Sequence, residues 1–209
     1  MNYWDNLLET DEHAANYMET YGEGVGALTR HELGKFINDG ESVLDVGCGP
    51  GWNFEHFLEY GPEVEYKGLD YSERFVRVSN QRILDKGLAR DGEDTFQLGD
   101  VRDIPEPNKS WDVVIFQDVL EHTNGYEKPI SEALRVARKR VIVTFWHLVQ
   151  NDEHINDDGN DGWGAWYEQG KWEKFLDSLN LHWLHHQFFF PENRQRDFYI
   201  IDLGVEHGL

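Results

Sequence analysis

The sequence predicts a doubly wound α/β protein whose mostly parallel, seven-stranded sheet ends in an antiparallel C-terminal hairpin and is preceded by N-terminal helices. Between residues 40 and 146, short apolar runs typical of buried strands alternate with segments typical of helices. A glycine-rich turn joins the first strand to the helix after it. The last two apolar runs are separated only by a short turn, which favours antiparallel pairing.

Each element is predicted from its local pattern. The run 111–116 is almost continuously apolar, as expected of a strand covered on both faces. Ser72 is a favourable N-cap for the helix that follows it. Strands are expected over 42–46, 64–69, 95–98, 111–116, 141–145, 181–190 and 197–203, helices over 1–20, 28–37, 52–60, 73–84, 126–137 and 171–179, and turns or loops over 22–26, 150–164 and 191–196.

The length of 209 residues suits a single domain over residues 1–209. Residues 1–40 are expected to form an N-terminal helical cap, and residues 41–146 a ligand-binding core. Residues 147–209 are expected to supply a substrate loop, a helix and the hairpin.

The chain is strongly acidic, with 40 Asp and Glu residues against 19 Lys and Arg and a formal net charge of −21. Such a surface repels phosphate backbones and acidic lipids, so neither a nucleic acid nor a membrane is an expected partner. A small neutral or cationic substrate fits this charge, as does a purely solubilising role in a salty cytoplasm. The basic cluster at 135–140 lies at a predicted helix end, where cations complement the helix dipole.

The compartment predicted from the sequence is the cytoplasm. A single cysteine cannot form an internal disulfide, which fits a reducing environment. No stretch has the length and apolarity of a membrane span, and the N-terminus begins with acidic and amide residues rather than a basic, apolar signal.

The turn that follows the first strand is the most informative motif. The sequence VLDVGCGPG places glycines at Gly47, Gly49 and Gly51. Glycine allows sharp turns and a close approach of ligand to backbone, and a strand, glycine turn and helix in succession form a nucleotide-binding geometry. A dinucleotide fingerprint requires a third glycine where this chain has Trp52. The spacing therefore disfavours an NAD site.

An acidic residue follows the second strand at the distance expected of a ribose ligand. Asp70 lies nineteen positions after Gly51, and a carboxylate can accept hydrogen bonds from both hydroxyls of a ribose diol. A role as a cap for the next helix is the alternative, but Ser72 fills that role better.

The motif VLDVGCGPG resembles the first motif of the class I S-adenosylmethionine-dependent methyltransferases, and residues 40–146 resemble this family most closely. The resemblance implies S-adenosylmethionine as cofactor and S-adenosylhomocysteine as product. It implies that Asp45 holds the methionine amino group, that Cys48 offers its backbone, that Asp100 accepts from the adenine amino group and that the backbone N–H of Val101 donates to the ring. Tyr71, beside Asp70, and Gln117, at the end of the fourth strand, complete the expected cofactor set.

We expect the residues that bind the methyl acceptor to lie outside the glycine turn. The segment FQDVLEH resembles the LEH segment of small-molecule methyltransferases, and His122 within it could be a general base. His122 could equally only pack near the methionine end of the cofactor. The expected acceptor-binding residues are the aromatic and imidazole side chains of Tyr17, Tyr21, Trp146, His147 and Trp166.

No metal site is expected. His182 and His186 would share one face of a strand while His185 points to the other face, which makes a poor set of three ligands.

The predicted activity is in-line methyl transfer from S-adenosylmethionine to an oxygen or nitrogen atom of a small-molecule acceptor. Two alternatives remain at the level of sequence. One is a non-catalytic module that binds S-adenosylmethionine as a partner or regulatory subunit, and the other is an NAD(P)-dependent oxidoreductase.

Overall fold

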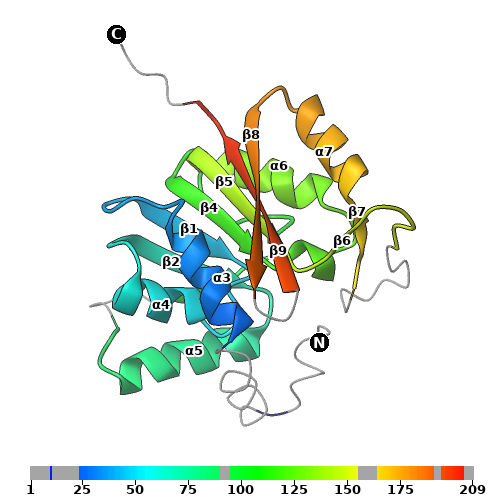
Figure 1. Cartoon of the computed structure of the whole chain (residues 1–209). Helices are drawn as coiled ribbons and strands as arrows, with labels where there is room; N and C mark the ends of the chain where they lie inside the picture. The colour runs from blue at the N-terminus through cyan, green and yellow to red at the C-terminus, as the bar shows by residue number, and fades with distance from the viewer. Residues whose placement is uncertain (1–9, 11–23, 90–94, 155–163, 191–193, 205–209) are drawn as a thin grey trace. The chain divides into compact units, whose positions relative to one another are not determined.

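The computed structural model describes residues 10, 24–89, 95–154, 164–190 and 194–204. The predicted helix over 1–20 and the candidate residues Tyr17 and Tyr21 therefore lie outside the described residues. The chain divides into two compact units, residues 1–105 and 106–209. Figure 1 shows the elements of both units along the chain.

The described part of the first unit contains a parallel three-stranded segment of sheet and the helices α3, α4 and α5. Its strands lie in the order β3-β2-β1, and Gly68 in β2 pairs with Asp45 in β1 on one side and with Phe96 in β3 on the other. Helix α3 packs on α4, and α5 packs along β2 and β3 (Figure 1). The elements are α3 (Val25–Gly34), β1 (Ser42–Val46), α4 (Trp52–Tyr60), β2 (Glu65–Asp70), α5 (Glu73–Asp85) and β3 (Phe96–Leu98).

The buried core of this unit includes a cluster of the aromatic rings of Phe54, Tyr66 and Phe96. The ring of Phe54, on α4, lies 5.3 Å from that of Tyr66 and 5.8 Å from that of Phe96, measured between centroids. The rings of Tyr66 and Phe96 are 6.3 Å apart. This cluster joins α4, β2 and β3 immediately behind the glycine turn.

The second unit holds the remaining strands in the order β4-β5-β9-β8. Strands β4 and β5 are parallel, whereas β9 is antiparallel to both β5 and β8. A small parallel pair, β6 with β7, lies outside this sheet. The elements are β4 (Trp111–Gln117), η1 (Leu120–His122), α6 (Glu127–Val136), β5 (Ala137–Phe145), β6 (Leu148–Val149), β7 (Tyr167–Glu168), α7 (Gln169–Ser178), β8 (His182–Phe190) and β9 (Arg194–Asp202).

The core of the second unit is centred on Trp172, a fully buried residue of α7. Its ring centroid lies 5.2 Å from that of Phe145, 5.6 Å from that of Tyr199 and 5.1 Å from that of Tyr126. These rings come from β5, β9 and the residue before α6, so the indole of Trp172 on α7 joins the sheet to α6 and α7.

The predicted fold class is confirmed: the seven strands are those of a mostly parallel, doubly wound sheet with an antiparallel C-terminal pair. Most boundaries agree to within one or two residues, and the starts of three elements differ by three or four. Helix α3 begins at Val25, inside the predicted glycine-rich turn, β5 begins at Ala137, and β9 begins at Arg194, inside the predicted 191–196 turn. The short pair of β6 and β7 was not predicted, because two-residue strands carry no periodicity.

Among the described residues, no helix is both long enough and apolar enough to cross a lipid bilayer.

Glycine at position 51 is required by the packing of the first unit. Gly51 has a φ of 81°, and a Cβ built on it would lie 2.4 Å from Cζ of the buried Phe96 ring. Gly40 has a similar φ of 80° but nothing within 4 Å of its added Cβ, so it is a matched control. We expect Gly40→Ala to cost about 1–2 kcal/mol through backbone strain alone, and Gly51→Ala to cost roughly 1–3 kcal/mol more through overpacking. Urea unfolding measures both, and equal losses would contradict the steric account.

Candidate functional site

The glycine turn between β1 and α4 has the backbone conformation that its sequence demands. Gly47, Gly49 and Gly51 all have positive φ values, of 77°, 53° and 81°. The N–H groups of Gly47 and Cys48 donate to the carbonyl oxygen of Leu69, at 2.7 and 3.0 Å. The turn is therefore fixed to the end of β2 by its own backbone.

The two sides of this turn differ in packing. Gly51 is in close contact with Phe96, whereas a Cβ on Gly49 would meet no atom of the described residues within 4 Å. Cys48 between them is buried, and burial, followed by the charges of Asp70 and Asp45, raises the pKa of its thiol well above the usual range. A protonated thiol is not a nucleophile, which agrees with the prediction that Cys48 contributes its backbone.

Asp70 ends β2 and contacts the turn directly. Its Oδ2 accepts the N–H of Gly49 at 2.7 Å, and its Oδ1 accepts the N–H of Ser72 at 2.8 Å. The Ser72 hydroxyl in turn accepts the N–H of Phe75, so Ser72 is the N-cap of α5, as predicted. A carboxylate oxygen can accept more than one hydrogen bond, so holding the glycine turn is compatible with the predicted role of Asp70 as a diol acceptor. Its neighbour Tyr71 is exposed.

Asp45 is a buried carboxylate at the end of β1. Its Oδ2 accepts hydrogen bonds from the Tyr66 hydroxyl at 2.5 Å and from Nδ2 of Asn53 at 2.9 Å. Its Oδ1 is buried and has no hydrogen-bond partner among the described residues. Burial raises the pKa of Asp45 to about 6, although the hydrogen bonds from Tyr66 and Asn53 oppose this shift. Oδ1 of Asp45 could accept from a buried cationic donor. Such a donor would offset the free-energy cost of burying an unpaired carboxylate.

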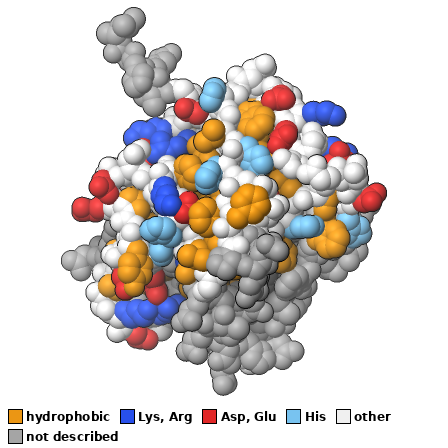
Figure 2. Space-filling model, viewed as in Figure 1, with side chains coloured by type: hydrophobic (Ala, Val, Ile, Leu, Met, Phe, Trp, Pro, Cys, Tyr) orange, Lys and Arg blue, Asp and Glu red, His pale blue; other side chains and the backbone are white. Residues whose placement is uncertain are grey.

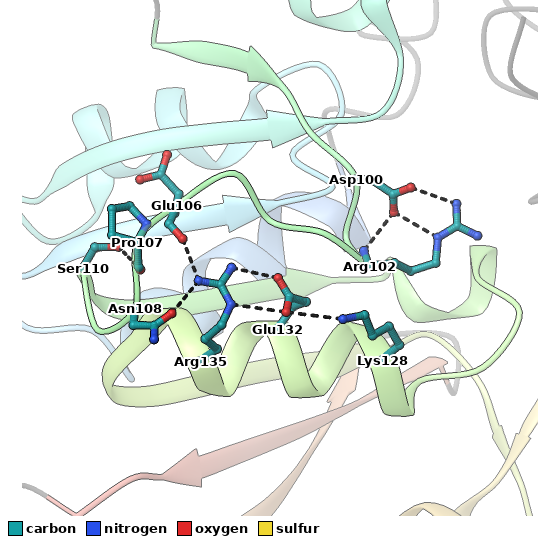
Figure 3. Close-up of polar contacts among 9 residues, drawn as sticks. All are labelled: Asp100, Arg102, Glu106, Pro107, Asn108, Ser110, Lys128, Glu132 and Arg135. Carbon is teal, nitrogen blue, oxygen red and sulfur yellow. Dashed lines mark hydrogen bonds and ion pairs between the residues drawn. The ribbon is translucent and has the colours of Figure 1, made fainter.

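Asp100 follows β3 and is paired within its own loop. The side chain of Arg102 donates from Nε to Oδ1 at 3.0 Å and from Nη2 to Oδ2 at 3.1 Å, and the Arg102 N–H also donates to Oδ1 (Figure 3). Burial acts to raise the pKa of Asp100, but the hydrogen bonds and charge of Arg102 outweigh it and the pKa is lowered. This pairing of Asp100 with Arg102, on either side of Val101, was not predicted, because it has no distinctive sequence pattern.

At the end of β4, in the second unit, Asp118 has a left-handed backbone. Its φ is 54°, and its carboxylate accepts from the Thr144 hydroxyl at 2.8 Å and from Nε of Arg196 at 3.2 Å. Gln117, just before it, has a buried Oε1 with no hydrogen-bond partner in the part of the chain described. Polar side chains from β4, β5 and β9 thus meet at the carboxyl end of β4.

Glu121 was not singled out by sequence reasoning and is fully buried. Its Oε1 accepts the N–H of Trp146 at 2.7 Å, and its backbone carbonyl accepts the N–H groups of Gly164 and Ala165 at 3.2 and 2.8 Å. Burial, followed by the charge of Asp118, raises the pKa of Glu121 well above its usual range. Glu121 therefore fixes η1 to the end of β5. A charged residue between Leu and His in a short motif gives no sequence signal of burial.

His122 lies against Trp146. The two ring centroids are 6.1 Å apart, and burial lowers the pKa of His122 despite the opposing charge of Asp118. The imidazole is consequently neutral at pH 7, the form in which it can accept a proton. The structure places this candidate base and one predicted acceptor-binding residue together.

Two further predicted acceptor-binding residues, His147 and the half-exposed Trp166, form an edge-to-face pair with ring centroids 5.4 Å apart. Tyr167 is fully buried, and its hydroxyl donates to the backbone oxygens of Leu120 and Thr123. Tyr167 is thus a core residue.

The three histidines of β8 have different surroundings. His185 stacks on Tyr199 with centroids 4.5 Å apart and contacts Asp197 through Nε2 at 2.8 Å. His186 instead contacts Phe198, on the other face. No group of three His, Cys, Asp or Glu side chains within the described ranges is arranged to hold a metal ion.

The residues of the glycine turn fit S-adenosylmethionine. The buried, open Oδ1 of Asp45 suits an ammonium group, Asp70 retains acceptor capacity for a ribose diol, and the space beside Gly49 permits close approach to the backbone. Together with the doubly wound sheet, this site defines a class I S-adenosylmethionine-dependent methyltransferase.

The chain belongs to the methyltransferase-domain family, whose model matches residues 37–182. It is 28% identical over 162 residues to ajmaline N-methyltransferase from Rauvolfia serpentina, a match that covers 71% of this chain and 55% of that protein. It is 31% identical over 103 residues to demethylmenaquinone methyltransferase from Geobacillus kaustophilus, which covers 49% of this chain and 43% of that protein. The chain thus spans about half the length of these curated relatives.

A solved structure has the same fold. Magnesium protoporphyrin IX methyltransferase from Synechocystis PCC 6803, with S-adenosylmethionine bound, superposes with a TM-score of 0.68 at 19% identity. The match covers 94% of this chain and 93% of that one.

The raised pKa of Asp45 predicts a pH-dependent stability. The pKa of Asp45 is about 6 in the folded protein and about 3.9 in the unfolded chain. Between these two pH values the folded protein therefore holds a proton on Asp45 that the unfolded chain has lost, so stability rises as the pH falls. Above pH 6 the buried carboxylate is charged, and the folded state carries the full cost of that charge. We expect the stability of the wild type relative to Asp45→Asn to rise by roughly 2 kcal/mol as the pH falls from 7 to 4. Chemical unfolding of both proteins across this range measures it, and a constant difference would contradict the assignment.

Proposed function

We propose that this methyltransferase transfers the methyl group of S-adenosylmethionine to an oxygen or nitrogen atom of a small-molecule acceptor. The observation that carries the proposal is the buried Asp45 carboxylate, with one open oxygen, next to a glycine turn that Asp70 holds in place. A site of this kind favours a ligand with both an ammonium group and a ribose, rather than a dinucleotide alone.

Each end of the cofactor has its own residues. Asp45 receives the α-ammonium group of the cofactor. Gly47, Gly49 and Gly51 allow the cofactor to approach the backbone of the turn closely, and the backbone of Cys48 lines this part of the site. Asp70 receives the ribose hydroxyls, with Tyr71 beside them. Asp100 and Val101 receive the adenine, and the fork from Arg102 holds the Asp100 carboxylate in one orientation for that contact. Gln117 contributes its buried amide oxygen.

The bound cofactor supplies a methyl group that is activated by the positive sulfonium charge, for in-line displacement by a nucleophile. The protein then has to position the acceptor and exclude water. His122 removes a proton from an acceptor hydroxyl or ammonium group, because its lowered pKa keeps it neutral at pH 7. Trp146, His147 and Trp166 contact the acceptor.

A small molecule is the acceptor class that the charge supports. The single cluster of basic residues noted in the sequence is engaged internally: Arg135 binds Glu132, Asn108 and the backbone of Glu106 (Figure 3), and Arg138 binds Asp112. On the face in Figure 2, Lys and Arg side chains occur in small groups interspersed with Asp and Glu. This distribution disfavours a nucleic-acid or acidic membrane partner.

Two of the named relatives also act on small molecules, an alkaloid and a quinone precursor by their names. Cytoplasmic location remains part of the proposal and rests on the single cysteine.

A turnover assay tests this function. The purified protein is incubated with S-adenosylmethionine and separate pools of small amines, phenols and alcohols, and S-adenosylhomocysteine is quantified against acceptor-free controls. We expect acceptor-dependent product with at least one pool. Saturable cofactor binding without product from any pool would favour a non-catalytic binding module.

Replacement of Asp70 is expected to weaken cofactor binding. Asp70→Ala removes the diol acceptor and the bond to Gly49, and lost hydrogen bonds to a charged group cost on the order of 1–3 kcal/mol. Isothermal titration with S-adenosylhomocysteine measures this, with Asp85→Ala on the surface of α5 as control. Unchanged affinity in Asp70→Ala would remove Asp70 from the ribose.

Replacement of His122 is expected to lower turnover without loss of cofactor affinity. A general base contributes roughly 10²–10⁴-fold to rate, so His122→Gln should reduce kcat by an amount in that range. Because the pKa of His122 is lowered, the wild-type rate should fall only below pH 6.5, and the variant should lose that limb of the profile. A variant with wild-type kcat and the same pH profile would leave His122 a packing residue.

A further inference from the structure

A buried tyrosine in the second unit makes polar contacts that its packing does not require. Tyr167 on β7 is fully buried, and its ring packs on those of Tyr126 and Phe145, with centroids 4.9 and 6.3 Å apart. A phenylalanine at this position would make the same ring contacts. Burial raises the pKa of Tyr167 to about 12, so its hydroxyl keeps its proton at neutral pH and can donate.

The Tyr167 hydroxyl binds the backbone of loop 120–125. Its proton can be donated to the carbonyl oxygen of Thr123, at 2.9 Å, or to that of Leu120, at 3.1 Å, and its oxygen accepts the N–H of Gly125 at 3.1 Å. The Thr123 hydroxyl lies 3.5 Å from it and itself donates to the carbonyl oxygens of Leu120 and Gly125. One phenol group therefore contacts this loop at its start, at its middle and at its end.

The residues before Tyr167 join the same loop to a predicted acceptor-binding side chain. The N–H of Ala165 donates to the carbonyl oxygen of Glu121 at 2.8 Å. Trp166 follows, is half-exposed and has its ring centroid 5.4 Å from that of His147. A short segment thus carries Trp166 and, on either side of it, the bonds that hold the loop of the proposed base.

We propose that Tyr167 is a positioning residue for His122. Its hydroxyl holds loop 120–125 against the segment that carries Trp166, so the imidazole of the base and the indole that contacts the acceptor keep one relative placement. A displacement of about 1 Å between reacting groups can cost on the order of 10²-fold in rate. This inference rests on the proposed function and adds to it the group that orients the base.

The test removes the hydroxyl and keeps the ring. Tyr167→Phe is compared with Tyr126→Phe, a matched control that takes a hydroxyl from the adjacent ring and leaves the bonds between Tyr167 and loop 120–125 in place. Thr123→Val is a second variant, which removes the hydroxyl that bonds the loop from within. Thermal unfolding verifies the fold of each protein.

Three quantities are measured for every variant. Kinetics with an acceptor from the turnover assay give kcat and KM, and calorimetry gives the Kd of S-adenosylhomocysteine. Proton NMR across the pH range gives the titration of His122, whose resonance is assigned from its absence in His122→Gln. A role in packing alone predicts a loss of stability with no change in kcat or in this titration.

We expect Tyr167→Phe to lower kcat by roughly tenfold to a hundredfold, while the acceptor KM and the Kd of S-adenosylhomocysteine stay within about twofold. Burial lowers the pKa of His122 in the wild type. Because a loosened loop admits water to the imidazole, this pKa should rise toward the ordinary value of about 6.5. Thr123→Val should move both readouts in the same direction by less, and Tyr126→Phe should move neither.

Wild-type kcat and an unchanged His122 titration in folded Tyr167→Phe would overturn the inference, even if thermal stability fell. Equal effects in Tyr126→Phe would also overturn it, because they would assign the effect to ring packing. If Tyr167→Phe does not fold, Thr123→Val decides, and an unchanged titration there contradicts the inference. The titration needs no acceptor, so it tests Tyr167 even if the wild type methylates nothing, a result that would contradict the proposed function instead.

Discussion

The glycine turn between β1 and α4 depends on the hydrogen bond from the Gly49 N–H to the Asp70 carboxylate. Three glycines with positive φ have little intrinsic preference for one conformation, and fixing them costs more backbone entropy than fixing other residues. The bond to Asp70, with the donors of Gly47 and Cys48 on the Leu69 carbonyl, attaches the turn to the end of β2. The residue expected to bind the ribose therefore also shapes the backbone that the methionine end approaches. This coupling links ligand affinity to the stability of the turn.

A second constraint is the buried charge of Asp45. Without a cation, one of its oxygens lacks any donor among the residues described, and burial raises its pKa to about 6. The apo protein thus keeps an electrostatic cost that a bound ammonium group would relieve. On the acceptor side, buried Glu121 fixes the backbone around His122, whose own pKa is lowered by burial. In each unit burial shifts the pKa of an ionisable group: it raises that of Asp45 in the first unit and lowers that of His122 in the second.

The sequence predicted the fold and the cofactor well because both are encoded locally. Buried strands are runs of apolar residues, and the glycine spacing with Asp70 in register is a short-range pattern. The features that could not be predicted from the sequence depend on contacts between distant segments or on pairs without a recognisable pattern. The stacking of Arg30 on Trp52 and the binding of Trp146 by Glu121 join residues that are 22 and 25 positions apart, and the fork from Arg102 to Asp100 has no distinctive pattern. The acceptor residues have no fixed motif, so their roles remain predictions, and Tyr17 and Tyr21 lie outside the described residues.

The most direct test of the central claim is a paired titration of the unmodified protein with S-adenosylhomocysteine and NAD⁺. The glycine turn, the lone charge of Asp45 and the presence of Trp52 in place of a third glycine all predict saturable binding of S-adenosylhomocysteine with one site per chain. They predict no saturable binding of NAD⁺ over the same concentrations. Tight binding of NAD⁺ without binding of S-adenosylhomocysteine would contradict the assignment of this turn to a methyl donor.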